Sequence, residues 1–136
     1  MKRALALTLL LALVPAAAAL AAKLSAPSSA RVGDEVTGKA SGLKPGRYVL
    51  RLSLDDTAGP RLACVARIGD LQDARGGKVR ISGHIPRKLT CYENNSVREG
   101  RIKTAPGKYH LIVGVPQGHS GFGNGSFVRR ALTIKR

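Results

Sequence analysis

The 136-residue sequence is short of aromatic, acidic and cysteine side chains. It has no Trp, three Tyr, two Phe and two Cys, and its 8 Asp and Glu stand against 23 Lys and Arg, a formal charge of +15. So few aromatic rings argue against a surface that stacks on nucleic-acid bases or sugars. The length leaves room for one domain. The hydrophobic fraction of 43% excludes a disordered basic tail.

The amino-terminal segment differs from the rest of the sequence. Two basic residues precede an uncharged run over 4–22, whose second half begins with Pro15, is rich in Ala and ends in the small-x-small triplet 19–21. This order predicts a signal peptide over residues 1–21 and one domain over residues 22–136, with no membrane span after cleavage. The alternative is a membrane anchor, because 19 residues are just long enough to cross a bilayer. Cleavage would leave 21 basic and 8 acidic residues, a formal charge of +13.

Two cysteines allow a single pairing. Export would place Cys64 and Cys91 in an oxidising compartment, where unpaired thiols are a liability. We therefore expect a disulfide that closes a loop of 27 positions and stabilises the fold by about 3.5 kcal/mol. The alternative is a pair of free, buried thiols.

Apolar residues alternate with polar ones at period two, and no stretch of 12 residues after the signal peptide has a helical apolar stripe. Such short segments with turns between them are typical of an all-β sandwich, here of about seven antiparallel strands. In the last segment Arg130 interrupts the apolar face, which indicates either a bulge beside it or a place at a sheet edge. The expected strands are residues 35–41, 48–54, 62–68, 79–85, 88–92, 109–115 and 126–135.

Two motifs suggest a family. The run 33–37, followed by 40–48, resembles the Gly-acidic turn, strand and Pro-Gly-x-Tyr corner of bacterial secreted immunoglobulin-like domains. Gly107-Lys108-Tyr109 is similar to their tyrosine corner, in which a Tyr hydroxyl bonds to upstream backbone. The resemblance implies an immunoglobulin-like sandwich with structural roles for Tyr48 and Tyr109. The sequence departs from antibody domains in having Leu111 where their second Cys stands, and in having no Trp.

The sequence offers little for catalysis or metal binding. Ser120 lies in a Gly-rich segment, but Phe122 occupies the position where a nucleophile elbow needs Gly, and no helix is expected after it. We therefore predict no catalytic residue and no cofactor. His84, His110 and His119 lack the close spacing of a metal motif, and we predict no metal site. A small periplasmic metal-binding or enzyme-accessory protein that uses these three histidines is the alternative function.

The segment 116–125 is the expected connection between the last two strands. It is long for a hairpin, and it holds two large side chains, His119 and Phe122. Long ordered loops at the end of such sandwiches often recognise partners. We therefore expect either a recognition loop that uses these two residues or a mobile connection.

Four arginines occupy outward positions of the expected strands: Arg51, Arg67, Arg80 and Arg129. If those strands are neighbours, one sheet face becomes an anion-binding field for phosphates, carboxylates or sulfates. The alternative is a scattered basic coat. Export argues against chromosomal nucleic acid as the partner. We therefore expect a secreted or periplasmic, non-catalytic binding or structural module that contacts an anionic envelope polymer or another exported protein.

Overall fold

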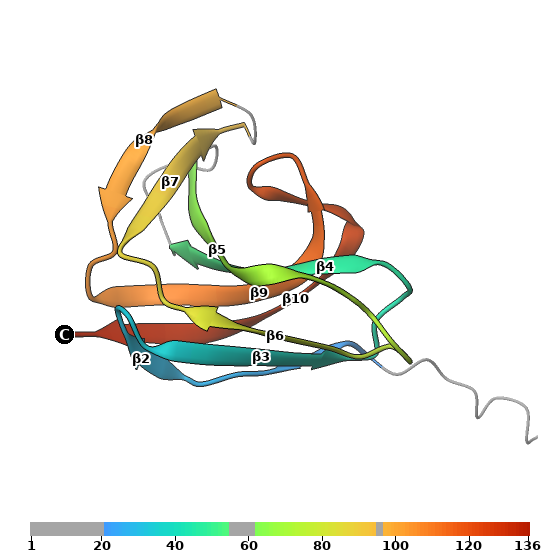
Figure 1. The fold of residues 1–136 in the computed structure, drawn as a ribbon. Helices are drawn as coiled ribbons and strands as arrows, with labels where there is room; N and C mark the ends of the chain where they lie inside the picture. Colours follow the sequence, from blue (N-terminus) through green and yellow to red (C-terminus); the bar gives the residue numbers. More distant parts are fainter. Residues whose placement is uncertain (1–20, 55–61, 95–96) are drawn as a thin grey trace, which may run out of the picture.

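The computed structural model describes residues 21–54, 62–94 and 97–136, and this part of the chain is all β, without a helix. Its strands form two open sheets, one with the order β1-β3-β6 and one with the order β2-β10-β9-β4-β5-β7-β8 (Figure 1). No helix of the described residues could cross a membrane. The strands are β1 (Lys23–Ser25), β2 (Ser29–Arg31), β3 (Glu35–Ser41), β4 (Arg47–Leu54), β5 (Leu62–Asp73), β6 (Val79–His84), β7 (Lys88–Glu93), β8 (Val97–Lys103), β9 (Gly107–Gln117) and β10 (Gly121–Lys135).

The predicted all-β class is confirmed, and each of the seven expected segments is a strand. The expectation of about seven antiparallel strands is wrong on two counts. The structure has three further strands, β1, β2 and β8, and β2 pairs with β10 in parallel. Strands β1 and β2 have three residues each, too few to show alternation. The signal peptide predicted for residues 1–21 lies, apart from Ala21, outside the described residues.

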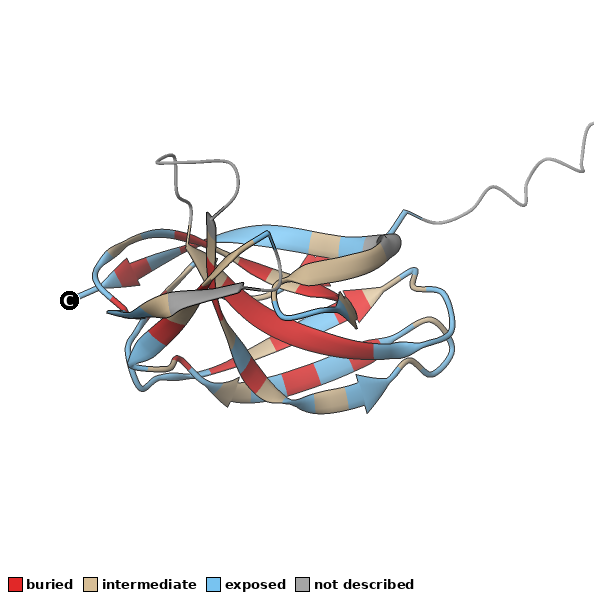
Figure 2. Cartoon of the chain, turned by 90° about the horizontal axis from the view of Figure 1, so that it is seen from above, coloured by how far each residue is buried: buried red, intermediate tan, exposed pale blue. Residues whose placement is uncertain are grey.

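The core lies between the two sheets, and it is built from the inward positions that alternation predicts. Along β3 and β6, buried residues alternate with exposed or half-buried ones, whereas β4 has five consecutive buried residues because its outer face is covered as well (Figure 2). From the seven-stranded sheet, Leu50 and Leu111 are fully buried, and from the three-stranded sheet Val36 and Ile81 are almost so. Burial of one such apolar side chain stabilises the fold by roughly 1.5–3 kcal/mol. Since these contacts join strands far apart in sequence, the core fixes the strand order.

The pairing of β10 decides between the two alternatives for Arg130, a bulge beside it or a place at a sheet edge. The β9–β10 register is unbroken from Phe127 to Ile134, so no bulge lies beside Arg130. The irregularity lies between Phe122 and Phe127 instead. Arg130 is exposed because β2 pairs with β10 only at its last residues, which leaves this part of β10 as a sheet edge.

Two tyrosine hydroxyls bond to backbone four residues upstream. Tyr48 donates to the Lys44 carbonyl oxygen at 2.8 Å, and Tyr109 donates to the Ala105 carbonyl oxygen at 2.6 Å. Both tyrosines are almost fully buried. Because β4 and β9 are antiparallel neighbours, and Tyr109 pairs with Leu54 at the end of β4, the two corners lie at opposite ends of this central pair.

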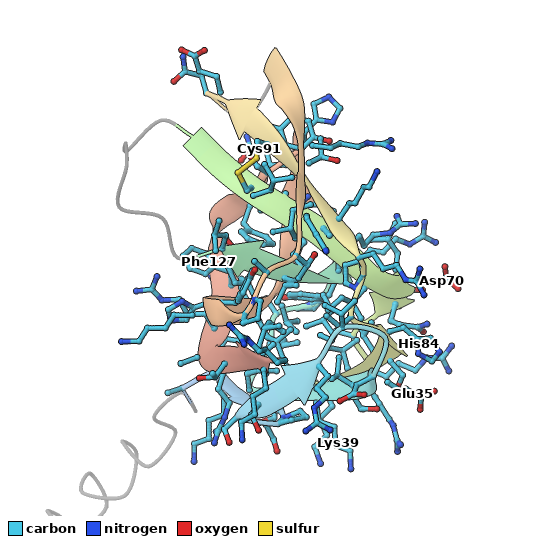
Figure 3. The ribbon with its side chains drawn as sticks, turned by 90° about the vertical axis from the view of Figure 1, so that its left-hand side faces the viewer. Glu35, Lys39, Asp70, His84, Cys91 and Phe127 are labelled. Carbon is cyan, nitrogen blue, oxygen red and sulfur yellow. A yellow bond between two sulfur atoms is a disulfide. The ribbon has the colours of Figure 1, made fainter. Side chains whose placement is uncertain are left out.

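The predicted disulfide is confirmed. Cys64 and Cys91 are directly opposite each other on β5 and β7, with their Cα atoms 3.9 Å apart and an S–S bond of 2.06 Å (Figure 3). Both side chains are buried on the core side. The bond therefore ties the β7–β8 ribbon to β5 within one sheet.

Candidate functional site

A cleft of about 390 Å³ lies on the outer face of the seven-stranded sheet. Its floor is formed by β4 and β5, with Val49, Arg51 and Arg67 among the lining residues. One wall is β7, which contributes Tyr92, and the other is the β9–β10 hairpin, which contributes His119. Figure 1 shows the β7–β8 ribbon and this hairpin rising on either side of β4 and β5.

The hairpin wall replaces the long loop expected over residues 116–125. Strand β9 continues to Gln117 and pairs with Gly121 at the start of β10, so that only 118–120 form the turn. The chain then bends at the irregularity in β10. This segment is therefore a hairpin with a short turn and an irregular second strand, rather than a long connection.

Two phenylalanines hold the hairpin on the sheet, and a glycine makes room for them. The rings of Phe122 and Phe127 stack with their centroids 5.5 Å apart. Both contact the position above Gly114 in β9, where a Cβ atom would meet the Phe122 ring and come within 2.8 Å of the Phe127 Cβ. The missing side chain at residue 114 thus allows the hairpin to lie close to the sheet.

Arg51, in β4, contacts the side of the hairpin that faces the sheet. Its Nη1 donates to the Gly121 carbonyl oxygen at 2.7 Å, and its Cζ lies 4.7 Å from the centroid of the Phe122 ring. A guanidinium over an aromatic face is favourable. Arg51 does point outward from the sandwich, but the hairpin covers it so well that only 6% of the residue is exposed. At this position the outward arginine is therefore covered by the hairpin rather than open to solvent.

Arg51 is one member of a row of cross-strand neighbours. Across β10, β9, β4 and β5 the register places Arg129 opposite Ile112, Ile112 opposite Arg51, and Arg51 opposite Arg67. Like charges directly opposite each other are destabilising. Burial lowers the pKa of Arg51, nearby Tyr92 raises it, and Arg67 lowers it again. Among the described residues, no acidic side chain forms an ion pair with Arg51. Asp73, for example, pairs with Arg47.

Of the four predicted arginines, the structure makes only Arg51 and Arg67 direct neighbours that line the cleft, while Arg129 lies beyond Ile112 in the same row. Arg80 lies on β6, in the other sheet, where it pairs with Lys39. The two residues predicted for loop recognition also separate. The His119 ring stacks on Tyr92 and lines the cleft. Phe122 instead packs on Arg51 and does not line the cleft.

The three histidines lie in different parts of the fold. His84, in β6, has its Nδ1 3.0 Å from the Gly33 carbonyl oxygen, while His110 lies in β9 and His119 in the hairpin. Within residues 21–54, 62–94 and 97–136 no group of three or more His, Cys, Asp or Glu side chains could hold a metal ion. Ser120 lies in a turn between two strands, so the strand-turn-helix setting of a nucleophile elbow does not exist there.

Sequence reasoning missed Tyr92 as a cleft residue. A signal was available, because the neighbouring Cys91 points inward and strand alternation therefore turns Tyr92 outward. The alternation pattern could not show which aromatic ring packs against Tyr92. His119 reaches Tyr92 only because the hairpin folds back over two intervening strands.

Comparison with known proteins gives a likeness of fold. No protein-family model matches the sequence, and no curated protein matches it. Among solved structures, macromomycin is similar with a TM-score of 0.55 and 15% identity, over 85% of this chain and 100% of that one. Apokedarcidin, described by its NMR assignments and solution conformation, is similar with a TM-score of 0.54 and 23% identity, over 87% and 100%. Both are small all-β proteins, and the likeness concerns the fold alone.

Proposed function

We propose that this chain is an exported, non-catalytic binding protein, an immunoglobulin-like sandwich behind a signal peptide, that holds a small organic anion in the cleft. The observation that carries the proposal is Arg51, a buried cation in the cleft floor without an acidic partner in the described part of the chain. It lies directly opposite a second cation, Arg67, that lines the same cleft. Such a pair lowers the stability of the free protein and favours an anion that joins it.

The donor count supports an anionic ligand. A guanidinium carries five N–H donors, and the hydrogen bond to Gly121 uses one of those of Arg51. An unpaired buried charge is strongly unfavourable unless a counter-charge satisfies it. A carboxylate or sulfonate between Arg51 and Arg67 would accept from both side chains and relieve their mutual repulsion.

The other residues that line the cleft indicate the chemistry of the part of the ligand that does not contact the arginines. Val49, Val65, Leu71 and Pro116 line the cleft with apolar groups. Its volume of about 390 Å³ is in the range of ligand-binding cavities, roughly 300–1,000 Å³. The proposed ligand therefore has one acidic group and an apolar body of modest size.

The proposal is tested with anilinonaphthalene sulfonate, which has one sulfonate on an apolar aromatic body and fluoresces when it is bound. The absence of Trp keeps tryptophan emission out of the measurement. Titration of the native protein is expected to show one saturable site. Arg51→Met keeps most of the side-chain volume and removes the charge. Since hydrogen bonds to charged groups contribute about 1.5–3 kcal/mol, the variant should bind about tenfold more weakly or worse.

Arg80→Met is the matched control, because it removes the same charge from an exposed position on the other sheet. It should leave the affinity unchanged. Thermal unfolding of both variants establishes that the fold is intact. Binding at many weak sites, or an equal loss in both variants, would overturn the proposed cleft function. Arg51→Met should change the free energy of unfolding by no more than about 1 kcal/mol, because removal of an uncompensated buried charge offsets the loss of the hydrogen bond to Gly121 and of the contact with the Phe122 ring.

A further inference from the structure

A second surface of the molecule carries a larger concentration of positive charge. Two shallow hollows of about 590 and 570 Å³ adjoin on the outer side of the three-stranded sheet, and they share Ser25, Lys39 and Ser41. We call them together the basic groove. The first hollow adds the cations Arg75, Lys78 and Arg80.

The second hollow adds Lys23, Arg129 and Arg130. The basic groove thus runs from the edge of β10, past β1 and β3, to β6 and the turn that precedes it, and it carries seven cations. Among the described residues no acidic side chain lines either hollow. Glu35 and Asp70, labelled in Figure 3, lie outside the groove.

The strand register explains how the charges come together. In antiparallel pairing, Ser25 of β1 is opposite Lys39 of β3, and Lys39 is opposite Arg80 of β6. Directly paired residues project from the same face, about 5 Å apart. Lys39 and Arg80 are therefore held side by side without an intervening acid, an arrangement that is unfavourable until an anion lies over it.

We propose that the basic groove binds an extended acidic polysaccharide, a chain that carries carboxylate or sulfate groups at regular intervals. This surface is separate from the ligand cleft, whose Arg51 and Arg67 do not line it. Cations at several successive positions fit a polymer with repeated charges better than a single small anion. The hydroxyls of Ser25 and Ser41 lie among them and supply hydrogen bonds that sugar hydroxyls use.

Two other polyanions, a nucleic acid and an anionic membrane surface, fit the basic groove less well. The groove has no aromatic side chain on which a nucleic-acid base could stack. The large apolar side chains that are exposed in the described residues, Val32, Ile102 and Phe127, do not line it either. The larger apolar residues that do line it, Leu24, Val79 and Val128, are buried or half-buried, so none of them projects beside the charges as the anchor of an interfacial membrane site does.

The test compares two double variants of the full protein in binding to polygalacturonate. Lys39→Gln with Arg80→Gln removes the paired cations of the groove. Lys88→Gln with Lys103→Gln removes an equally exposed cross-strand cation pair from the β7–β8 ribbon. The groove variant is expected to bind about tenfold more weakly with a shallower salt dependence, and the ribbon variant to stay within about twofold of the native protein.

Equal losses in the two double variants would overturn the proposal, because they would show a response to net charge alone. Tighter binding to a single-stranded oligonucleotide, or to vesicles of phosphatidylglycerol, would also overturn it. Should the first double variant not fold, Arg75→Gln with Lys78→Gln replaces it, since the contacts between these two residues are backbone hydrogen bonds. Arg51→Met should bind the polymer like the native protein, so failure here and failure of the cleft proposal are distinguishable.

Discussion

The imidazole ring of His119 lies flat on the ring of Tyr92, with the ring centroids 4.9 Å apart and the planes inclined by 3°. The two residues come from the β9–β10 hairpin and from β7, strands that β4 and β5 separate in the sheet. The stack therefore connects the two walls of the cleft above its floor. A ligand that reaches Arg51 and Arg67 must pass this contact or move it.

Tyr92→Ala should loosen the hairpin. Aromatic pairs contribute about 0.5–1.5 kcal/mol beyond the area that they bury, so amide hydrogen exchange over 117–121 should become about two- to tenfold faster. Tyr92→Phe keeps the ring and is the control, with exchange close to that of the native protein. If the alanine variant exchanges no faster than the phenylalanine variant, the stack does not hold the hairpin.

Gly114→Ala should displace the hairpin from the sheet. The added Cβ would meet the Phe122 ring and the Phe127 Cβ, and such overpacking typically lowers stability by about 1–3 kcal/mol. Urea unfolding measures the loss. Gly123→Ala in the same hairpin is the control, because its Cβ would find its nearest neighbours at an ordinary 3.9 Å. Equal stability of the two variants would show that the close approach at residue 114 is not required.

Loss of the disulfide should lower stability and loosen one wall of the cleft. Replacing Cys64 and Cys91 with Ala should reduce the free energy of unfolding by about 2–4 kcal/mol, because the unfolded chain regains the freedom of a 27-residue loop. Hydrogen exchange in β7 should increase more than in β3, which the bond does not touch. Dithiothreitol should destabilise the native protein and leave the double variant unchanged. Insensitivity of the native protein to full reduction would contradict this account.

Tyr109 should make the fold sensitive to alkaline pH. Burial disfavours the phenolate and raises the pKa of its hydroxyl above the ordinary value. The unfolded phenol ionises first, at about pH 10. The stability that this group contributes is therefore complete below that pH and is lost as the pH rises from there through the higher pKa of the folded state.

Tyr109→Phe tests this dependence. At neutral pH the variant should lose about 0.5–1.5 kcal/mol, the usual contribution of one hydrogen bond. Above about pH 10 the gap between native protein and variant should narrow, because only the native protein still has this group to ionise. Unfolding free energies measured on both proteins from neutral to strongly alkaline pH give the difference. A gap that does not change with pH would refute the assignment.

Local pattern was enough to predict seven of the ten described strands and the faces of their residues. Because side chains alternate along a strand, period two alone placed Leu50, Leu111 and Ile81 in the core and turned Arg51 and Arg67 outward. With only two cysteines, the sequence also determined the disulfide. Each of these properties depends on residues within one segment or on a count, and none of them requires knowledge of which strands are neighbours.

Only the tertiary structure decided which outward residues meet. Residues 51, 67, 112 and 129 form one row because packing of the whole core sets the strand order, while Arg80 joined Lys39 in the other sheet for the same reason. The fold of the hairpin over Gly114 turned an outward arginine into a buried one. Alternation gives the face of a residue, but its neighbours and its cover come from contacts between segments distant in sequence, and those are set by packing rather than by local pattern.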